Sequence, residues 1–394
     1  MASVVTTKSL FHVDSSSTTT STSYVFPTSF RSLWLYTSAN WDGTVEVYFE
    51  AVLSNSAGAT ASAILSNAAG SANVTGSEVQ TTATSQTRIR SGDILSALTN
   101  ATDYGVRIKA SSGTTSIYNA KLIIKQTGTI TKKEYYIPLT AGASGTTSTS
   151  LIEATRSCYV EFDPTQWDGT YSVYLEATGQ VNSGGFFGFA QLRNVTDSTT
   201  DAAAISTSTT TPTRMRSTAL SMAGSVKTYS VHYRTNSGAV TFSLSDACLV
   251  IIQSGSPTKG VFHDATKAGY LSTTATSNTL LNGSYLYWDD NDWSVTSQTI
   301  MYAGTLRISN AASTATSPLL DSGSNEDVNI PRTGSNLKVY VSTSFNPDDD
   351  MEYRSMLKTS NASHTAEVFT PRIVSVVDFS DPAVPYTPRI VEFF

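Results

Sequence analysis

The residue types that most often carry catalysis are sparse in this sequence and do not fall at spacings that serve a reaction. There are four histidines, His12, His232, His263 and His364. The sequence contains repeated segments, and His12 and His263 occupy equivalent positions in two of them. We therefore interpret these histidines as structural residues at the start of a strand. No nucleophile-and-base pattern, glycine-rich phosphate loop or zinc motif accompanies them. The sequence therefore predicts a protein that is not an enzyme, with no catalytic residue, bound metal or cofactor.

Oxygen ligands and thiols are the other groups that could do chemistry. Two acidic runs, Asp289–Asp292 and Asp348–Asp350, could offer oxygen atoms to Ca²⁺. Neither has the glycine and terminal glutamate of an EF-hand loop, so we expect solvated acidic loops. The two cysteines, Cys158 and Cys248, are expected to be buried free thiols, and a disulfide between them stays open.

One tetrapeptide recurs at a long interval. Trp41, Trp167 and Trp293 are each 126 residues apart (167 − 41 and 293 − 167), and the first two begin the sequence Trp-Asp-Gly-Thr. One interpretation makes Asp-Gly a turn and the Trp a cover over one end of a core. The other makes Trp41 and Trp167 stacking platforms for the sugar rings of a glycan. The interval itself has the length of a whole domain.

A second repeated element is a pair of arginines two residues apart. It occurs as Arg88 and Arg90 in one copy and as Arg214 and Arg216 in the next. Alternate residues of a strand face the same side, so each pair should share one face. These arginines either pair with glutamates of a neighbouring strand or contact another subunit, because arginine is enriched at interfaces. The candidate glutamates are Glu46, Glu50 and Glu176.

The elements that must position these residues are short strands. Alternating segments such as Val45–Glu50 and Tyr171–Glu176 recur at the same offset, with turn residues between them. The pattern predicts an all-β chain of three tandem antiparallel β-sandwich domains, each jelly-roll-like, with a repeat of about 126 residues. The predicted boundaries are 1–129, 130–257 and 258–378, the last repeat being the most diverged.

A proline-spaced arm, 379–394, follows the third repeat. Its apolar residues have no evident place inside a sandwich, and an exposed apolar tail normally marks an interface. We therefore predict that the arm contacts other subunits. The arm residues proposed for this contact are Phe379, Pro385, Tyr386, Ile390, Val391, Phe393 and Phe394.

Composition narrows the partners and the location. Charged residues make up 14% of the chain and the net charge is −6, which disfavours nucleic acid and anionic membranes as partners. The N-terminus has no signal-peptide pattern, although the Ser- and Thr-rich composition suits an extracellular protein. A virion protein made in the host cytoplasm satisfies both observations, and an extracellular surface protein is the alternative.

The repeated Trp-Asp-Gly-Thr, the strand that follows it and the Thr-Arg-x-Arg-Ser element together resemble the jelly-roll modules of tailed-bacteriophage structural proteins. The resemblance covers the first two repeats well and the third poorly. It implies a non-enzymatic virion protein of the decoration, fibre or neck and tail type. Such a protein packs against other virion proteins and copies of itself as a homo-oligomer. The same jelly-roll features also resemble those of carbohydrate-binding modules. A glycan-binding adhesin or fibre that binds a host surface glycan is therefore the alternative.

Overall fold

The computed structural model describes residues 3–11, 17–27, 32–200, 204–265, 270–288 and 297–378. Several features singled out from the sequence lie outside these residues. They are His12, Trp293, the acidic run 289–292 and the whole arm 379–394. The backbone of His263 is described within a strand, but its side chain is not.

The described residues form strands and three single turns of 3₁₀ helix. We call residues 3–128 module 1, residues 133–254 module 2 and residues 259–378 module 3. Module 1 contains β1 (Ser3–Phe11), β2 (Ser17–Thr19), β3 (Trp34–Tyr36), η1 (Ser38–Asn40), β4 (Thr44–Asn55), β5 (Ala61–Asn67), β6 (Val79–Thr81), β7 (Thr87–Asp93), η2 (Leu95–Ala97), β8 (Thr102–Ala110) and β9 (Thr115–Gly128). Module 2 contains β10 (Lys133–Pro138), β11 (Ser144–Thr146), β12 (Ile152–Glu153), β13 (Val160–Phe162), η3 (Pro164–Gln166), β14 (Thr170–Val181), β15 (Gly188–Asn194), β16 (Thr199–Thr200), β17 (Ile205–Thr207), β18 (Thr213–Arg216), β19 (Lys227–Thr235) and β20 (Phe242–Ser254). Module 3 contains β21 (Lys259–Ala265), β22 (Tyr270–Thr273), β23 (Thr279–Trp288), β24 (Ser297–Ile308), β25 (Ala315–Asp321), β26 (Glu326–Arg332), β27 (Lys338–Phe345), β28 (Met351–Thr359) and β29 (Ala366–Asp378).

The strand order is the same in all three modules and defines a jelly roll. In module 1 one sheet runs β1-β9-β4-β7 and the other runs β3-β8-β5-β6, with β2 continuing the line of β1 along β9. Counting β1 and β2 as one strand, the first sheet holds the first, eighth, third and sixth strands, and the second sheet holds the second, seventh, fourth and fifth. The sheets β10-β20-β14-β18 and β12-β19-β15-β16 of module 2 repeat this order, as do β21-β29-β24-β27 and β23-β28-β25-β26 of module 3. The predicted all-β sandwich class is confirmed.

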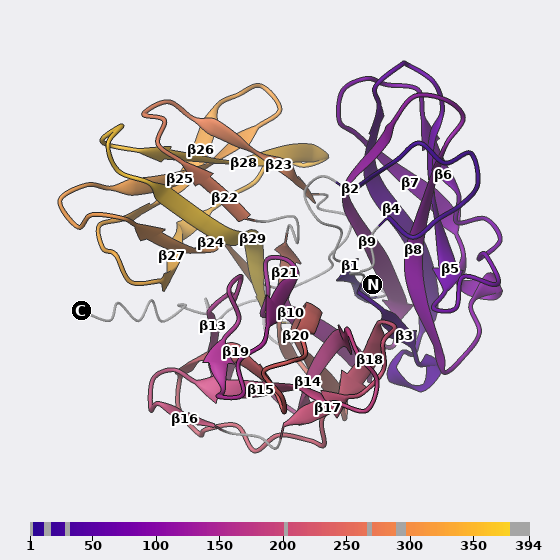
Figure 1. The fold of residues 1–394 in the computed structure, drawn as a ribbon, viewed down its shortest axis with the longest axis horizontal. Coiled ribbons are helices and arrows are strands. Elements are labelled where there is room, and N and C mark those ends of the chain that lie inside the picture. The colour runs from indigo at the N-terminus through magenta and orange to yellow at the C-terminus, as the bar shows by residue number, and fades with distance from the viewer. Residues whose placement is uncertain are drawn as a thin grey trace.

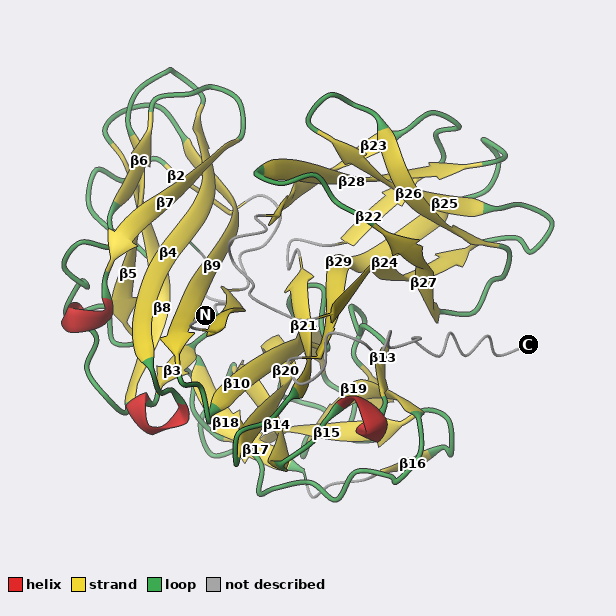
Figure 2. Ribbon diagram, turned by 180° about the vertical axis from the view of Figure 1, so that it is seen from behind, coloured by secondary structure: helices red, strands yellow, loops and turns green. Residues whose placement is uncertain are grey.

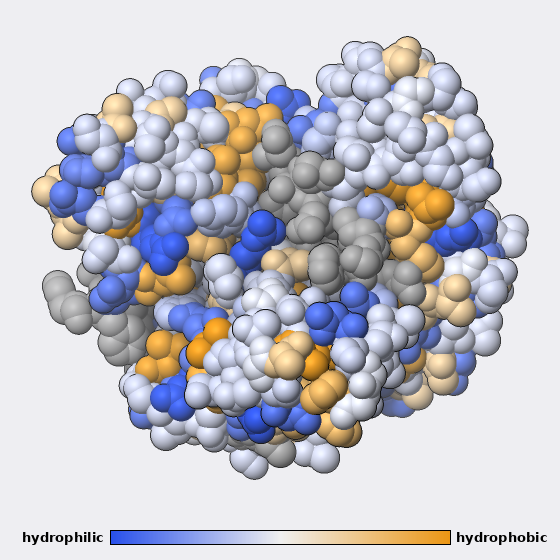
Figure 3. All heavy atoms as spheres, viewed as in Figure 1, coloured by the Kyte–Doolittle hydropathy of each residue, from blue (hydrophilic) through white to orange (hydrophobic). Residues whose placement is uncertain are grey.

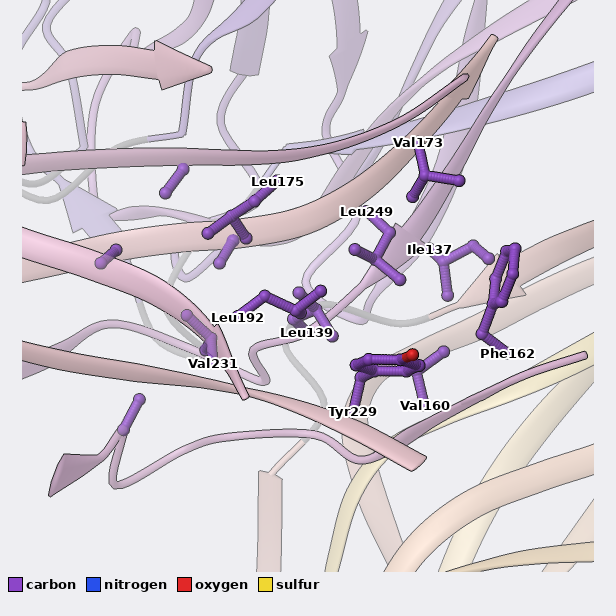
Figure 4. Packing of buried hydrophobic residues seen from close by; sticks show 14 of the residues in the cluster. Ile137, Leu139, Val160, Phe162, Val173, Leu175, Leu192, Tyr229, Val231 and Leu249 are labelled. Carbon is purple, nitrogen blue, oxygen red and sulfur yellow. The ribbon is translucent and has the colours of Figure 1, made fainter. Parts of the chain in front are cut away.

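Each core lies between the two sheets of a module, because alternate side chains of facing strands point inward. Figure 4 shows this packing in module 2, where Leu175 and Leu249 of one sheet face Leu192 and Val231 of the other. Tyr229 closes the same cluster and is fully buried. The alternation read from the sequence therefore predicts the buried face of these strands correctly.

The three modules are arranged as a ring. In Figure 1 they surround a centre where β1, β10 and β21 lie, and each of these first strands contacts the other two. The only helical segments among the described residues are the three short turns drawn red in Figure 2, and none of them could cross a membrane. The domain boundaries predicted at 129/130 and 257/258 stay predictions, and the strands of successive modules are separated by 129–132 and 255–258.

Candidate functional site

The first two of the repeated tryptophans lie inside the cores. Trp41 and Trp167 are each 6% exposed. Trp167 stacks on Phe162 at 6.2 Å between ring centroids and meets the edge of Tyr135 at 4.9 Å. A sugar ring needs an accessible aromatic face, which neither indole offers. The burial contradicts the interpretation of Trp41 and Trp167 as glycan-stacking platforms and agrees with a packing role.

The Asp-Gly that follows each of these tryptophans holds the connection to the next module. The Asp42 carboxylate accepts hydrogen bonds from the backbone N–H of Thr131 (3.0 Å) and of Lys132 (3.2 Å), and from the Thr131 hydroxyl. The side chain of Gln126 adds to this by donating to the carbonyls of Asp42 and Lys132, both at 3.0 Å. These contacts fix the segment 129–132, which joins module 1 to module 2.

Module 2 repeats the arrangement on the segment that joins it to module 3. Asp168 accepts from the N–H of Thr258 (3.0 Å) and of Lys259 (2.9 Å), and Gln253 takes the place of Gln126. Gly169 has φ +65°, and a Cβ there would lie 2.7 Å from the Ser254 carbonyl oxygen. Gly43 of module 1 has the same conformation. We call each Asp with its bonded linker residues a linker clamp.

The arginine pairs converge on a buried glutamate in each of the first two modules. In module 1 the side chain of Glu50 is 2% exposed and receives Arg88 at 2.8 Å and Arg90 at 3.1 Å. Lys121 of β9 reaches the same carboxylate at 3.4 Å. The predicted pairing with Glu50 is therefore present, whereas no described ion pair joins Glu46 to these arginines.

Module 2 has the same cluster with one change. Glu176 receives Arg214 at 2.9 Å and Arg216 at 2.7 Å. Arg216 also contacts a second buried carboxylate, Glu134 of β10, at 3.2 Å. Burial raises the pKa of Glu134, and the positive charge of Arg216 opposes that increase. In both modules the charges lie on the outer face of the sheet that contains the first strand.

These outer faces are covered by the neighbouring module, so the arginines lie in joints within the chain. At the joint of modules 1 and 2, the Leu33 N–H donates to Thr178 Oγ1 (3.2 Å) and Trp34 Nε1 donates to the Tyr136 hydroxyl (2.9 Å). Arg214 pairs with Asp103 of module 1 at 2.6 Å. Tyr136 and Val250 of module 2 belong to the same apolar cluster as the core of module 1.

The joint of modules 2 and 3 uses equivalent positions with different chemistry. The Tyr159 N–H donates to Thr305 Oγ1 (3.1 Å), which repeats the bond from Leu33 to Thr178 one module further on. Cys158 lies 2.7 Å from the hydroxyl of Thr370. Val374 and other apolar residues of module 3 join the core cluster of module 2. The joint also contains a buried cation, Arg372, which donates to the carbonyl of Tyr159 at 3.4 Å.

The joint of modules 3 and 1, which we call the seam, closes the ring. Arg88 pairs with Glu352 at 2.9 Å and lies over the ring of Tyr287 at 3.8 Å. The Tyr285 hydroxyl donates to the carbonyl of Gln86 at 3.3 Å. Glu352 precedes the buried Tyr353 on β28 as Asp103 precedes the buried Tyr104 on β8, so the two acids are equivalent.

Sequence reasoning missed the residues that accept these contacts. Asp103 and Glu352 have different neighbours in the sequence, and only their equivalent positions in the strand pairing relate them. A signal did exist for the linker clamps. Thr131-Lys132 and Thr258-Lys259 recur at almost the same interval as the Asp-Gly pairs, and their partners are these same aspartates.

The remaining groups with potential chemistry stay structural in the described residues. Cys158 and Cys248 are both buried free thiols, as expected. No group of His, Cys, Asp and Glu suited to a metal is found in the part of the chain that the structure describes. In the run Asp348–Asp350, Asp350 accepts from the hydroxyl of Tyr287, and the N–H of Asp348 donates to Tyr353.

The burial of Lys133 beside linker 255–258 can be tested through the pH dependence of stability. Its ammonium donates to the carbonyl of Pro257 at 3.0 Å, and burial lowers its pKa from 10.5 to about 8, partly opposed by Asp168 and Asp42. Between these values the unfolded chain binds more protons than the native protein, so stability should rise with pH. Lys133→Met should remove this rise. The difference in unfolding free energy between the variant and the unaltered protein should therefore change by about 3 kcal/mol between about pH 8 and pH 10.5. Urea unfolding at several pH values measures it. Parallel pH profiles for the two proteins would contradict the assignment, and Lys132→Met at the exposed neighbouring position is the control.

Comparisons with known proteins give distant similarity in fold. No protein-family model matches the chain, and no curated protein matches it in sequence. The chain is similar to the VP2 subviral particle protein of infectious bursal disease virus, at 9% identity and TM-score 0.24, covering 94% of this chain and 81% of that one. It is also similar to an archaeal virus protein described with a triple jelly roll fold and turret assembly, at 10% identity and TM-score 0.20, covering 94% and 91%. The tandem CBM22 domains of Paenibacillus barcinonensis Xyn10C match at 8% identity and TM-score 0.19, covering 60% and 96%. At these TM-scores none of them carries an argument about function, and the fold class rests on the strand order.

Proposed function

We propose that this protein is a non-enzymatic structural component of a virus particle and acts by packing against other proteins. The finer form of the proposal is a part of a tailed bacteriophage: a capsid decoration protein, a fibre or a neck or tail appendage. Its partners are other virion proteins and copies of itself. It is made in the host cytoplasm and resides on the particle.

The observation that supports this proposal is the use made of the repeated polar residues. Asp42 and Asp168 hold linkers, and Arg88 and Arg214 each join one module to another. A catalytic or ligand-binding module would present its repeated polar residues to solvent. Here the repeated residues fix the positions of three sandwiches, which is what a rigid building block of an assembly requires.

The surface is consistent with the same role. On the face shown in Figure 3 most residues have intermediate hydropathy, and the strongly polar and apolar ones occur in small separate groups. The glycan-binding alternative loses its named residues, because Trp41 and Trp167 are buried. We therefore do not propose a second function.

A mass-spectrometric inventory of purified particles tests the proposal. We expect the chain in particles at a fixed stoichiometry, still present after a high-salt wash. A copy number in the hundreds would mean decoration, and a few copies or a dozen would mean a neck or tail part. A chain abundant in infected cells yet absent from washed particles would refute the virion role.

A further inference from the structure

The seam differs from the other two joints in what holds it. Linkers 129–132 and 255–258 tie the other joints together, and each linker is held by a clamp. No linker runs from module 3 back to module 1. Among the described side chains, the apolar cluster of module 3 contains no residue of module 1, whereas the other two joints share clusters. Among these described side chains, the seam therefore depends more on polar contacts than the tied joints do.

Those polar contacts are individually weak. The ion pair from Arg88 to Glu352 has side-chain exposures of 19% and 29%. Such a pair is typically worth below about 1 kcal/mol and weakens with added salt. The contact of Arg88 with the ring of Tyr287 adds a cation–π interaction of roughly 0.5–2 kcal/mol. Tethering within one chain supports these contacts, because it gives the two surfaces a high effective concentration.

The contact at the seam is heterologous, since it joins two different surfaces. One surface is the edge of module 3 that carries Tyr285, Tyr287 and Glu352, and the other is the face of module 1 around Arg88. Heterologous contacts of this kind either close a ring or join further copies. Every copy of the chain carries one surface of each kind.

We propose that the seam opens and re-forms between two copies of the chain, so that module 3 of one copy docks on the Arg88 face of module 1 of another. The second copy is the occupant because it presents the complementary charge and aromatic surface that the seam itself uses. Two opened copies that exchange module 3 reciprocally form two seams and leave neither surface exposed. This exchange yields a closed two-chain assembly with no contact absent from the single ring.

A charge exchange tests the proposal directly. Arg88→Glu and Glu352→Arg are made in separate chains, so each chain has like charges across its own seam. Mixing equal amounts of the two restores opposite charges only between chains. We expect each variant alone to run as a single chain and the mixture to show twice that molar mass by light scattering after size exclusion. The chain with both substitutions restores its own seam and should return to a single-chain mass.

The equivalent ion pair at a tied joint is the matched control. Asp103→Arg and Arg214→Glu reverse the pair between modules 1 and 2, and Arg214 also contacts a buried glutamate as Arg88 does. Because linker 129–132 keeps modules 1 and 2 together, mixing these two variants should give no two-chain species. Single-chain mass in the seam mixture, or two-chain mass in this control mixture, would overturn the proposal.

The Arg88→Glu chain keeps Arg90 and Lys121 beside Glu50, which favours its folding. If its thermal unfolding is nevertheless not cooperative, the unaltered protein decides the question. Unlabelled and heavy-nitrogen-labelled chains are mixed in about 1 M salt, where the Debye length is about 3 Å, and returned to low salt at roughly millimolar concentration. Native mass spectrometry should then show a mixed-label pair. Single chains alone would refute exchange at the seam, whatever the protein does on a particle.

Discussion

Glu50→Ala is expected to lower the free energy of unfolding by about 3–5 kcal/mol, because it removes the carboxylate that the buried Lys121 shares with the partly buried Arg88 and Arg90. Arg88, Arg90 and Lys121 all contact Glu50, and the side chain of Lys121 is as buried as that of Glu50. Removing one partner of a buried ion pair costs more than the pair contributes, because the remaining charge stays desolvated. Urea unfolding followed by circular dichroism measures the change.

Glu352 provides the control, because it contacts the same arginine from the seam. Its side chain is 29% exposed, so water can replace it beside Arg88. Glu352→Ala should therefore cost below about 1 kcal/mol in unfolding free energy. Equal losses for the two substitutions would mean that burial does not decide the energetics of this cluster.

Module 3 shows that the fold does not require these charges. Ala303 takes the position of Glu50, and Val339 and Val341 take the positions of the two arginines. The acid that would reach across from module 2 is replaced as well, by Thr228. The joint of modules 2 and 3 thus lacks both acids and both arginines. The buried Arg372, which pairs with Ala303 as Lys121 pairs with Glu50, instead donates to the carbonyl of Tyr159 at 3.4 Å.

The sequence predicted much of this architecture because the signals were local. Alternating strands, the turn at Asp42-Gly43 and the pairing of Glu50 with Arg88 all follow from residues close in sequence or on neighbouring strands. The interpretation of Trp41 as a packing residue rested on its repetition and agrees with its burial.

The joints could not be predicted in the same way. The bond from Arg88 to Glu352 links residues that lie far apart in sequence. No periodicity within a module reports which faces will meet when three modules form a ring. The third repeat has Ser294-Val295 where the first two have Asp-Gly, whose aspartates hold the linkers.

The second large effect is expected at the linker clamp of module 2. Asp168→Ala removes the acceptor for the N–H groups of Thr258 and Lys259 and for the Thr258 hydroxyl. Hydrogen bonds to a charged acceptor contribute roughly 1.5–3 kcal/mol each, and solvent can satisfy part of this partly exposed set. We expect a loss of about 3 kcal/mol in unfolding free energy. Limited proteolysis should also reveal new cleavage within 255–258, because the linker loses its fixed conformation.

The pH dependence of this clamp has a definite sign. Partial burial raises the pKa of Asp168, but the hydrogen bonds from Thr258 and Lys259 outweigh it and hold the pKa below its usual 3.8. The stabilisation is therefore present above the unfolded pKa and is lost as the pH falls through the folded value. Asp168→Ala should converge with the unaltered protein in stability under acid conditions.

Asp163→Ala is the matched control for the clamp. Asp163 lies in the same module and accepts from the N–H and hydroxyl of Thr165, which are local to η3. This substitution should cost about 1 kcal/mol, as for other lost caps, and should leave the linker resistant to protease. If Asp163→Ala opens 255–258 as readily as Asp168→Ala, cleavage reports general loosening of module 2. If only Asp168→Ala opens it, the repeated Asp-Gly acts on the connection between modules.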